Sequence, residues 1–125
     1  MHHFIRALYI AVALVNLLPS MGVLGAPWLE SLYGLRVEGD DLLLLARHRA
    51  ALFGLTGGLL LAAAFAPEIR ILAAVMGLLS MLSFVVLALP LDAHGAAIQR
   101  VFWVDVVASV LLAIAAGFGW RHSER

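Results

Sequence analysis

The chain has 125 residues, of which 64% are hydrophobic, and its mean hydropathy of +1.04 excludes a water-soluble globular domain, since too little polar surface remains to cover a core. Its net charge is zero and its sequence pI is about 7.0, so we expect no basic patch for a nucleic-acid partner. Cys is also absent, which excludes disulfide exchange, thiolate metal sites and cysteine nucleophiles. Four apolar runs of spanning length fill the chain, at about residues 5–25, 41–65, 67–89 and 96–120. They predict an all-α fold, a four-helix transmembrane bundle in a single domain.

The first run, residues 5–25, is longer than the apolar region of a typical signal peptide, so we interpret it as a retained span. Tyr9, Asn16 and Ser20 are spaced at i, i+7 and i+11, which predicts one polar stripe on this helix. Pro19 is predicted to kink the helix near its far end, because proline cannot donate a backbone hydrogen bond.

The longest polar connection follows, at residues 26–39. Pro27 is suited to a first helical position and Gly34 to a stop, so the sequence predicts a short interfacial helix between them. Trp28 and Tyr33 are typical of the aromatic belt at a membrane surface. We favour a plain anchoring connection here over a lid.

The second run, residues 41–65, carries three consecutive cationic or titratable side chains, Arg47, His48 and Arg49. Each costs a few kcal/mol near the centre of a bilayer, so each needs a partner or a function. Because consecutive residues point about 100° apart on a helix, only one or two can face the interior. We expect the remainder to snorkel or to meet a neighbouring chain.

Small residues recur every four positions along this second run, a pattern that predicts close packing against a neighbouring helix. The ridge consists of Ala50, Gly54, Gly58 and Ala62. The third run carries Ser80 and Ser83, and the fourth carries Arg100 and Asp105 inside its apolar sequence.

Counting about 1.5 Å per residue from the helix ends places polar groups of all four helices in one layer of the outer half. Asp105 at that depth would be protonated or paired, and we predict a pair with Arg49 or His48. Arg100 is a less suitable partner, since it lies about 140° around the same helix. The predicted ligand-binding residues are Asn16, Arg47, His48, Arg49, Ser80, Arg100 and Asp105. The same contacts could instead fix the packing of the helices.

The inner half of the predicted bundle is almost entirely apolar, which argues against a transporter or a proton channel, although ion- or proton-coupled transport stays open as an alternative. His48 has no second His at its level for a bridged haem, and no residue spacing matches a metal site, so we expect neither cofactor nor metal. We expect a pocket open to the outer side that binds a lipid-, quinone- or isoprenoid-like molecule. An acid–base enzyme using His48 and Asp105 also stays open, but the residues do not require catalysis. The non-enzyme rival is an accessory subunit that docks onto a partner membrane protein, and a homo-oligomer is a related alternative.

Loop charges predict the orientation in the membrane. The termini and the second connection share one side and carry most of the Arg residues outside the spans, whereas the opposite loops are mainly acidic. The positive-inside rule then places both termini in the cytoplasm.

Several motifs together resemble a group of uncharacterised small bacterial four-helix membrane proteins, loosely DoxX-like. The residues that carry the resemblance are LYGL from Leu32, D-x-L-L-L-L-A-R-H-R-A-x-L-F-G from Asp40, SMLSF from Ser80 and R-x-x-x-x-D from Arg100. The resemblance covers nearly the whole chain and implies a protein of the bacterial inner membrane. It implies no established activity and assigns no catalytic residue.

Overall fold

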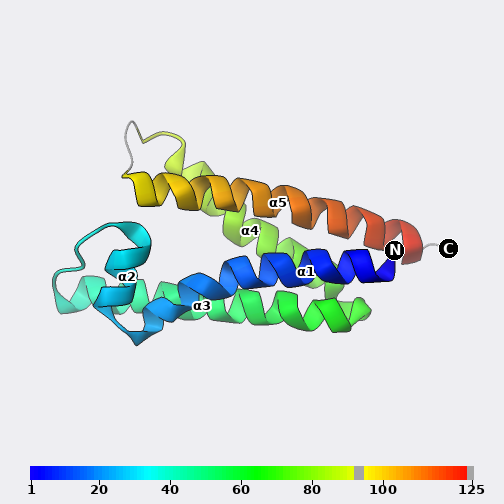
Figure 1. Ribbon diagram of the computed structural model, residues 1–125, viewed down its shortest axis with the longest axis horizontal. Coiled ribbons are helices and arrows are strands. Elements are labelled where there is room, and N and C mark those ends of the chain that lie inside the picture. The colour runs from blue at the N-terminus through cyan, green and yellow to red at the C-terminus, as the bar shows by residue number, and fades with distance from the viewer. Residues whose placement is uncertain (92–94, 124–125) are drawn as a thin grey trace.

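The computed structural model describes residues 1–91 and 95–123, and the all-α prediction is confirmed. The elements in chain order are α1 (His2–Leu17), the 3-10 helix η1 (Leu18–Leu24), α2 (Ala26–Tyr33), α3 (Asp40–Phe65), the 3-10 helix η2 (Pro67–Ile69), α4 (Arg70–Ala88) and α5 (Ala96–Ser123). Figure 1 shows the long helices side by side, with both termini at one end and α2 at the other. Residues 92–94, in the connection between the third and fourth predicted runs, lie outside the described residues.

Within the described residues, four segments are long and apolar enough to cross a membrane: His2–Leu24, Asp40–Phe65, Pro67–Ala88 and Ala96–His122. They agree with the four predicted spans to within a few residues. The pattern is that of a multi-pass helical membrane protein.

The first span changes character at Pro19. The α-helix ends at Leu17 and the chain continues as 3-10 helix to Leu24, because proline has no N–H to donate to the preceding turn. Gly25, at φ 145°, then turns the chain into α2. The short helix predicted after Pro27 is confirmed, and it ends at Gly34 in the left-handed conformation (φ 64°) that glycine adopts without strain.

Helix packing places α3 and α5 diagonally across the bundle, since each packs mainly against α1 and α4. Two close approaches between the long helices are at Gly57, where a Cβ would lie 2.7 Å from Leu17 Cγ, and at Gly77, where it would lie 2.8 Å from Leu112 Cδ2. At Gly57 a Cβ would also lie 3.1 Å from the Ala13 carbonyl oxygen, so a larger residue there would force the backbone of the neighbouring helix to shift.

The predicted small-residue ridge on α3 is wrong in its second half. A Cβ at Gly58 would meet nothing within 4 Å, and Ala62 is exposed. Each four-residue step turns about 40° beyond a full circle, so a strict i+4 series drifts off one face. The buried line alternates steps of three and four instead: Ala50, Phe53, Gly57, Leu60 and Ala64.

The main core fills the half of the bundle that holds the termini, and its one charged side chain among the described residues donates hydrogen bonds to the backbone. Arg70 donates from Nε to the Ala63 carbonyl (3.0 Å) and from Nη2 to the Ala64 carbonyl (3.2 Å). These carbonyls belong to the last turn of α3, which has no partners within the helix and carries the negative end of its dipole. Tyr9 completes the cluster by donating its hydroxyl to the Arg70 carbonyl at 2.9 Å.

Candidate functional site

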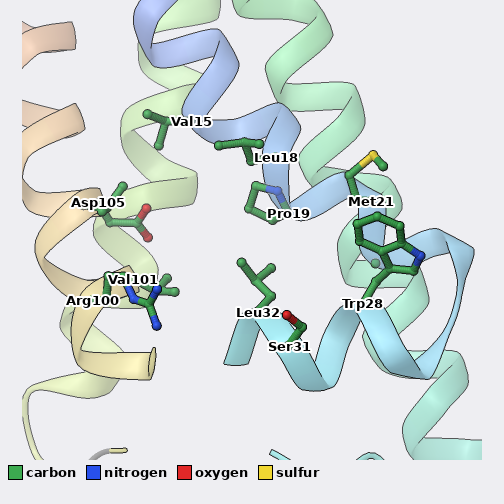
Figure 2. A pocket seen from close by; sticks show the side chains of 12 residues that line it. Val15, Leu18, Pro19, Met21, Trp28, Ser31, Leu32, Arg100, Val101 and Asp105 are labelled. Carbon is green, nitrogen blue, oxygen red and sulfur yellow. The ribbon is translucent and has the colours of Figure 1, made fainter. Parts of the chain in front are cut away.

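A pocket of about 440 Å³ lies between η1, α2 and α5, at the end of the bundle away from the termini. Its size falls within the usual range for small-molecule sites. Most of its wall is aliphatic or aromatic, and Figure 2 shows two charged side chains, Arg100 and Asp105, reaching it from α5. The lining residues are Val15, Leu18, Pro19, Met21, Gly22, Trp28, Ser31, Leu32, Arg100, Val101, Val104 and Asp105.

Asp105 is the buried polar group of this pocket. Its side chain is 5% exposed, and its Oδ2 atom has no hydrogen-bond partner among the described residues. Leaving a buried acceptor unsatisfied costs about 1–3 kcal/mol, and more when the group is charged. In Figure 2 its carboxyl group extends from α5 into the pocket, toward α2. A ligand that donates a hydrogen bond here would remove that cost.

Arg100 lines the same pocket, five residues before Asp105, and it is exposed. The angular argument from the sequence separated these two residues, but a long arginine side chain reaches around the helix. They form no ion pair: the described residues contain only one, between Arg36 and Glu38 at 3.6 Å. The pocket wall therefore carries a cation and an unsatisfied acceptor.

An apolar groove of about 350 Å³ continues from the pocket between α1 and α5. Three residues line both spaces: Val15, Arg100 and Val104. The rest of the groove is lined by Ala11, Val12, Trp103, Val107, Ala108 and Leu111. From Arg100 to Leu111 it follows α5 for about 16 Å, at 1.5 Å per residue. Pocket and groove together form one continuous space that has its charged side chains at one end and an apolar wall along the rest.

The predicted ion pair between Asp105 and Arg49 or His48 is wrong. The charge of Arg49 acts on Asp105 through space, but no Arg or His nitrogen of the described residues lies within 4.0 Å of the carboxylate. The reason is the diagonal arrangement of α3 and α5. His48 is exposed and does not line the pocket.

Arg49 is held by aromatic rings instead. Its Cζ lies over the rings of Tyr33 (5.7 Å), Phe53 (5.3 Å) and Phe84 (5.1 Å). Each such contact contributes about 0.5–1 kcal/mol at an exposed site. Three rings thus offset much of the roughly 2.5–3.5 kcal/mol that an arginine costs at the centre of a spanning helix. They leave its hydrogen-bonding capacity unused, because ring faces are weak acceptors.

The predicted polar layer is therefore divided. Arg49 and Ser80 line a separate pocket of about 210 Å³ between α3 and α4, which shares no residue with the one at Asp105. Arg47 donates from Nε to the Val23 carbonyl at 2.8 Å, so it links α3 to η1. Asn16 is 1% exposed and donates to the Val12 carbonyl (3.0 Å) and the Met81 sulfur (3.7 Å), while its Oδ1 has no partner among the described residues. Of the seven predicted residues, Arg100 and Asp105 alone line the larger pocket.

The sequence interpretation missed one contribution to the site, α2, which supplies Trp28, Ser31 and Leu32 to the pocket wall. Its aromatic residues indicated an interfacial helix, but not which neighbour its inner face would cover.

Tyr33 couples α2 to the charged groups of both pockets. Burial raises the pKa of its hydroxyl above the ordinary value of 10.0; the positive charge of Arg49 opposes this change, and the negative charge of Asp105 adds to it. Tyr33 lies at the end of α2, outside the four spans. The pKa of Tyr33 therefore reports whether α2 packs against the rest of the bundle.

The chain matches no protein-family model, no curated protein and no solved structure. No group of three or more His, Cys, Asp or Glu side chains in the described ranges, 1–91 and 95–123, is arranged to hold a metal ion. The class of protein thus rests on the fold itself: a helical bundle with four candidate spans and a side pocket beside α2.

Proposed function

We propose that this protein binds an amphipathic molecule, a lipid-, quinone- or isoprenoid-like compound, with its polar head at Asp105 and Arg100 and its apolar chain along α1 and α5. The observation that carries the proposal is the buried, unpartnered Oδ2 of Asp105 in the wall of a mainly apolar 440 Å³ pocket. The adjoining groove supports it, because the groove offers an apolar path that starts at the same residues.

The two charged groups define the chemistry of the preferred head. Asp105 requires a donor, such as a hydroxyl or an ammonium group. Arg100 requires an acceptor, such as a carbonyl, carboxylate or phosphate. A head that carries both functions satisfies the pocket, whereas a purely hydrocarbon ligand leaves Asp105 unsatisfied.

The apolar half around the termini favours binding over transport. Its core is built mainly from Ala, Leu, Ile, Val and Met side chains, and the buried Tyr9 and Arg70 side chains donate hydrogen bonds to backbone carbonyls. A transport path needs polar groups through that half as well.

We also propose that the protein lies in the bacterial inner membrane with both termini in the cytoplasm. The excess of Arg near the termini supports this orientation, and so does the resemblance to small DoxX-like bacterial membrane proteins. The native chain lacks Cys, so single cysteines at Glu38 and His122 can be labelled cleanly in intact cells. Labelling of the His122→Cys protein from outside would contradict the orientation.

The binding function is tested by mass spectrometry of small molecules that co-purify with the protein. We expect one species to be enriched with the wild type and to fall at least about tenfold in Asp105→Leu and Arg100→Gln, since each removes a charged hydrogen-bonding group. Asp41→Asn and Arg36→Gln are the matched controls, because both residues are exposed and outside the pocket. Equal recovery from Asp105→Leu and the wild type would refute the proposal.

The alternative of an accessory subunit is favoured by one observation, the open space next to Gly58 beside the exposed Leu55. Loss of a co-purifying protein from Gly58→Leu, with no specific small molecule in any sample, would support it.

A further inference from the structure

A second polar site lies between α3 and α4, and it is independent of the pocket at Asp105. Arg49 reaches it from α3, and Ser80 and Ser83 reach it from α4, in a space of about 210 Å³. Apolar side chains complete the lining, among them the exposed Leu52 and Leu87. The site therefore combines a cation, hydroxyl groups and an apolar surface that faces outward.

The guanidinium of Arg49 is positioned but not hydrogen-bonded. The rings of Tyr33, Phe53 and Phe84 surround it, and in the described part of the chain no carbonyl or carboxylate accepts a bond from it. Arginine has five N–H donors in a planar fork that matches the oxygens of a phosphate or carboxylate. Aromatic contacts from three helices hold this fork in place, which reduces the entropy lost when an anion binds.

The serines add a donor on the facing helix. Ser83 donates its hydroxyl to the Ser80 carbonyl at 2.7 Å, so it is already engaged. The Ser80 hydroxyl makes no hydrogen bond to any residue within 1–91 or 95–123, and it lines the same space as Arg49. With Arg49 and Ser80 as donors and no carboxylate in the lining, the site favours an anion with several acceptor oxygens.

We propose that Arg49 and Ser80 bind a phosphate group in the groove between α3 and α4. The exposed leucines beside the site favour a phosphate that is attached to acyl chains, as in a phospholipid headgroup. A soluble phosphate ester would use the same donors. This site does not depend on the binding function of the pocket at Asp105, because the two share no lining residue.

Native mass spectrometry of the purified full-length protein in detergent tests this proposal. The probes are phosphatidylglycerol, a diacylglycerol with the same chains, and a fatty acid that presents a carboxylate. We expect phosphatidylglycerol to bind at least about tenfold more tightly than either other probe, since charge-assisted hydrogen bonds are lost with them. Arg49→Gln should remove this preference, and Ser80→Ala should reduce it several-fold.

Arg47→Gln is the matched control, because Arg47 lies on the same helix but its Nε is bonded to the Val23 carbonyl. It should keep the preference. Competition by millimolar inorganic phosphate would identify a soluble phosphate as the natural source, and resistance to it would identify the lipid.

Equal affinity for phosphatidylglycerol and diacylglycerol would overturn the proposal, and so would an undiminished preference in Arg49→Gln. Equal binding of the fatty acid would overturn the choice of phosphate over carboxylate. Should Arg49→Gln fail to fold, Arg49→Lys keeps the charge without the fork, and it should lose the preference in part. Asp105→Leu should keep the preference, which separates this site from the other pocket.

Discussion

The two ends of the bundle differ in whether a buried charged side chain has hydrogen-bond partners. Near the termini, Arg70 is 8% exposed, and two carbonyls of α3 accept its hydrogen bonds. At the other end, Asp105 is 5% exposed and its Oδ2 has no partner among the described residues. Burial alone therefore does not distinguish a structural charge from a binding group. The difference lies in whether the surrounding backbone satisfies it.

The packing explains why the ends differ. Gly57 and Gly77 let the helices approach closely, and the pocket beside the core near the termini is smaller, about 160 Å³. At the other end, Pro19 converts the first span to 3-10 helix, and α2 packs between η1 and α5. A short helix cannot fill the same volume as a spanning one, so a pocket remains beside it.

The largest expected effect on stability comes from overpacking the close contact between α1 and α3 at Gly57. Gly57→Leu places side-chain atoms against Leu17 and the Ala13 carbonyl, so it should lower the free energy of unfolding by about 3 kcal/mol. Gly58→Leu is the matched control, since a Cβ at Gly58 meets nothing within 4 Å. Thermal unfolding in detergent measures both. Similar losses in the two variants would mean that the α1–α3 contact is not as close as described.

A smaller effect contrasts the two buried charges directly. Arg70→Gln removes charge-assisted hydrogen bonds to α3 and should cost about 2 kcal/mol. Asp105→Leu removes an unsatisfied group of similar shape, so it should leave stability unchanged or raise it by up to about 1 kcal/mol. The midpoints of denaturant unfolding provide the comparison. A strong loss of stability in Asp105→Leu would show that Asp105 has a structural partner.

The smallest expected effect is a pH dependence of the stability contributed by Tyr33 in α2. Because burial raises the pKa of Tyr33, its contribution to stability is complete below pH 10 and is lost as the pH rises through the higher folded-state value. The difference in tyrosinate absorbance between the wild type and Tyr33→Phe isolates this residue. We expect its midpoint above 10.0, the ordinary value for tyrosine. A midpoint at or below 10.0 would indicate that α2 is not seated against the bundle.

Several features followed from the sequence because they depend on position along the chain. The apolar runs determined four helices of spanning length, and Pro27 and Gly34 determined the limits of α2. Counting residues also placed Arg49 and Asp105 at similar depths, since the rise per residue of an α-helix is constant. The candidate site was predictable to that extent: two of the seven proposed residues line the larger pocket, and two line the smaller one.

The tertiary structure alone decided which side chains meet at a given depth. Asp105 and Arg49 lie on helices that are diagonal in the bundle, so one faces a pocket beside α2 and the other a cage of three aromatic rings. The hydrogen-bond partners of Arg70 could not be predicted from the sequence either, because they are backbone carbonyls, which every residue has. The depth of a residue depends only on its position along its own helix. Its contacts depend on how that helix is rotated and on which helices lie beside it. Packing at residues such as Gly57 and Gly77 determines this rotation and these neighbours.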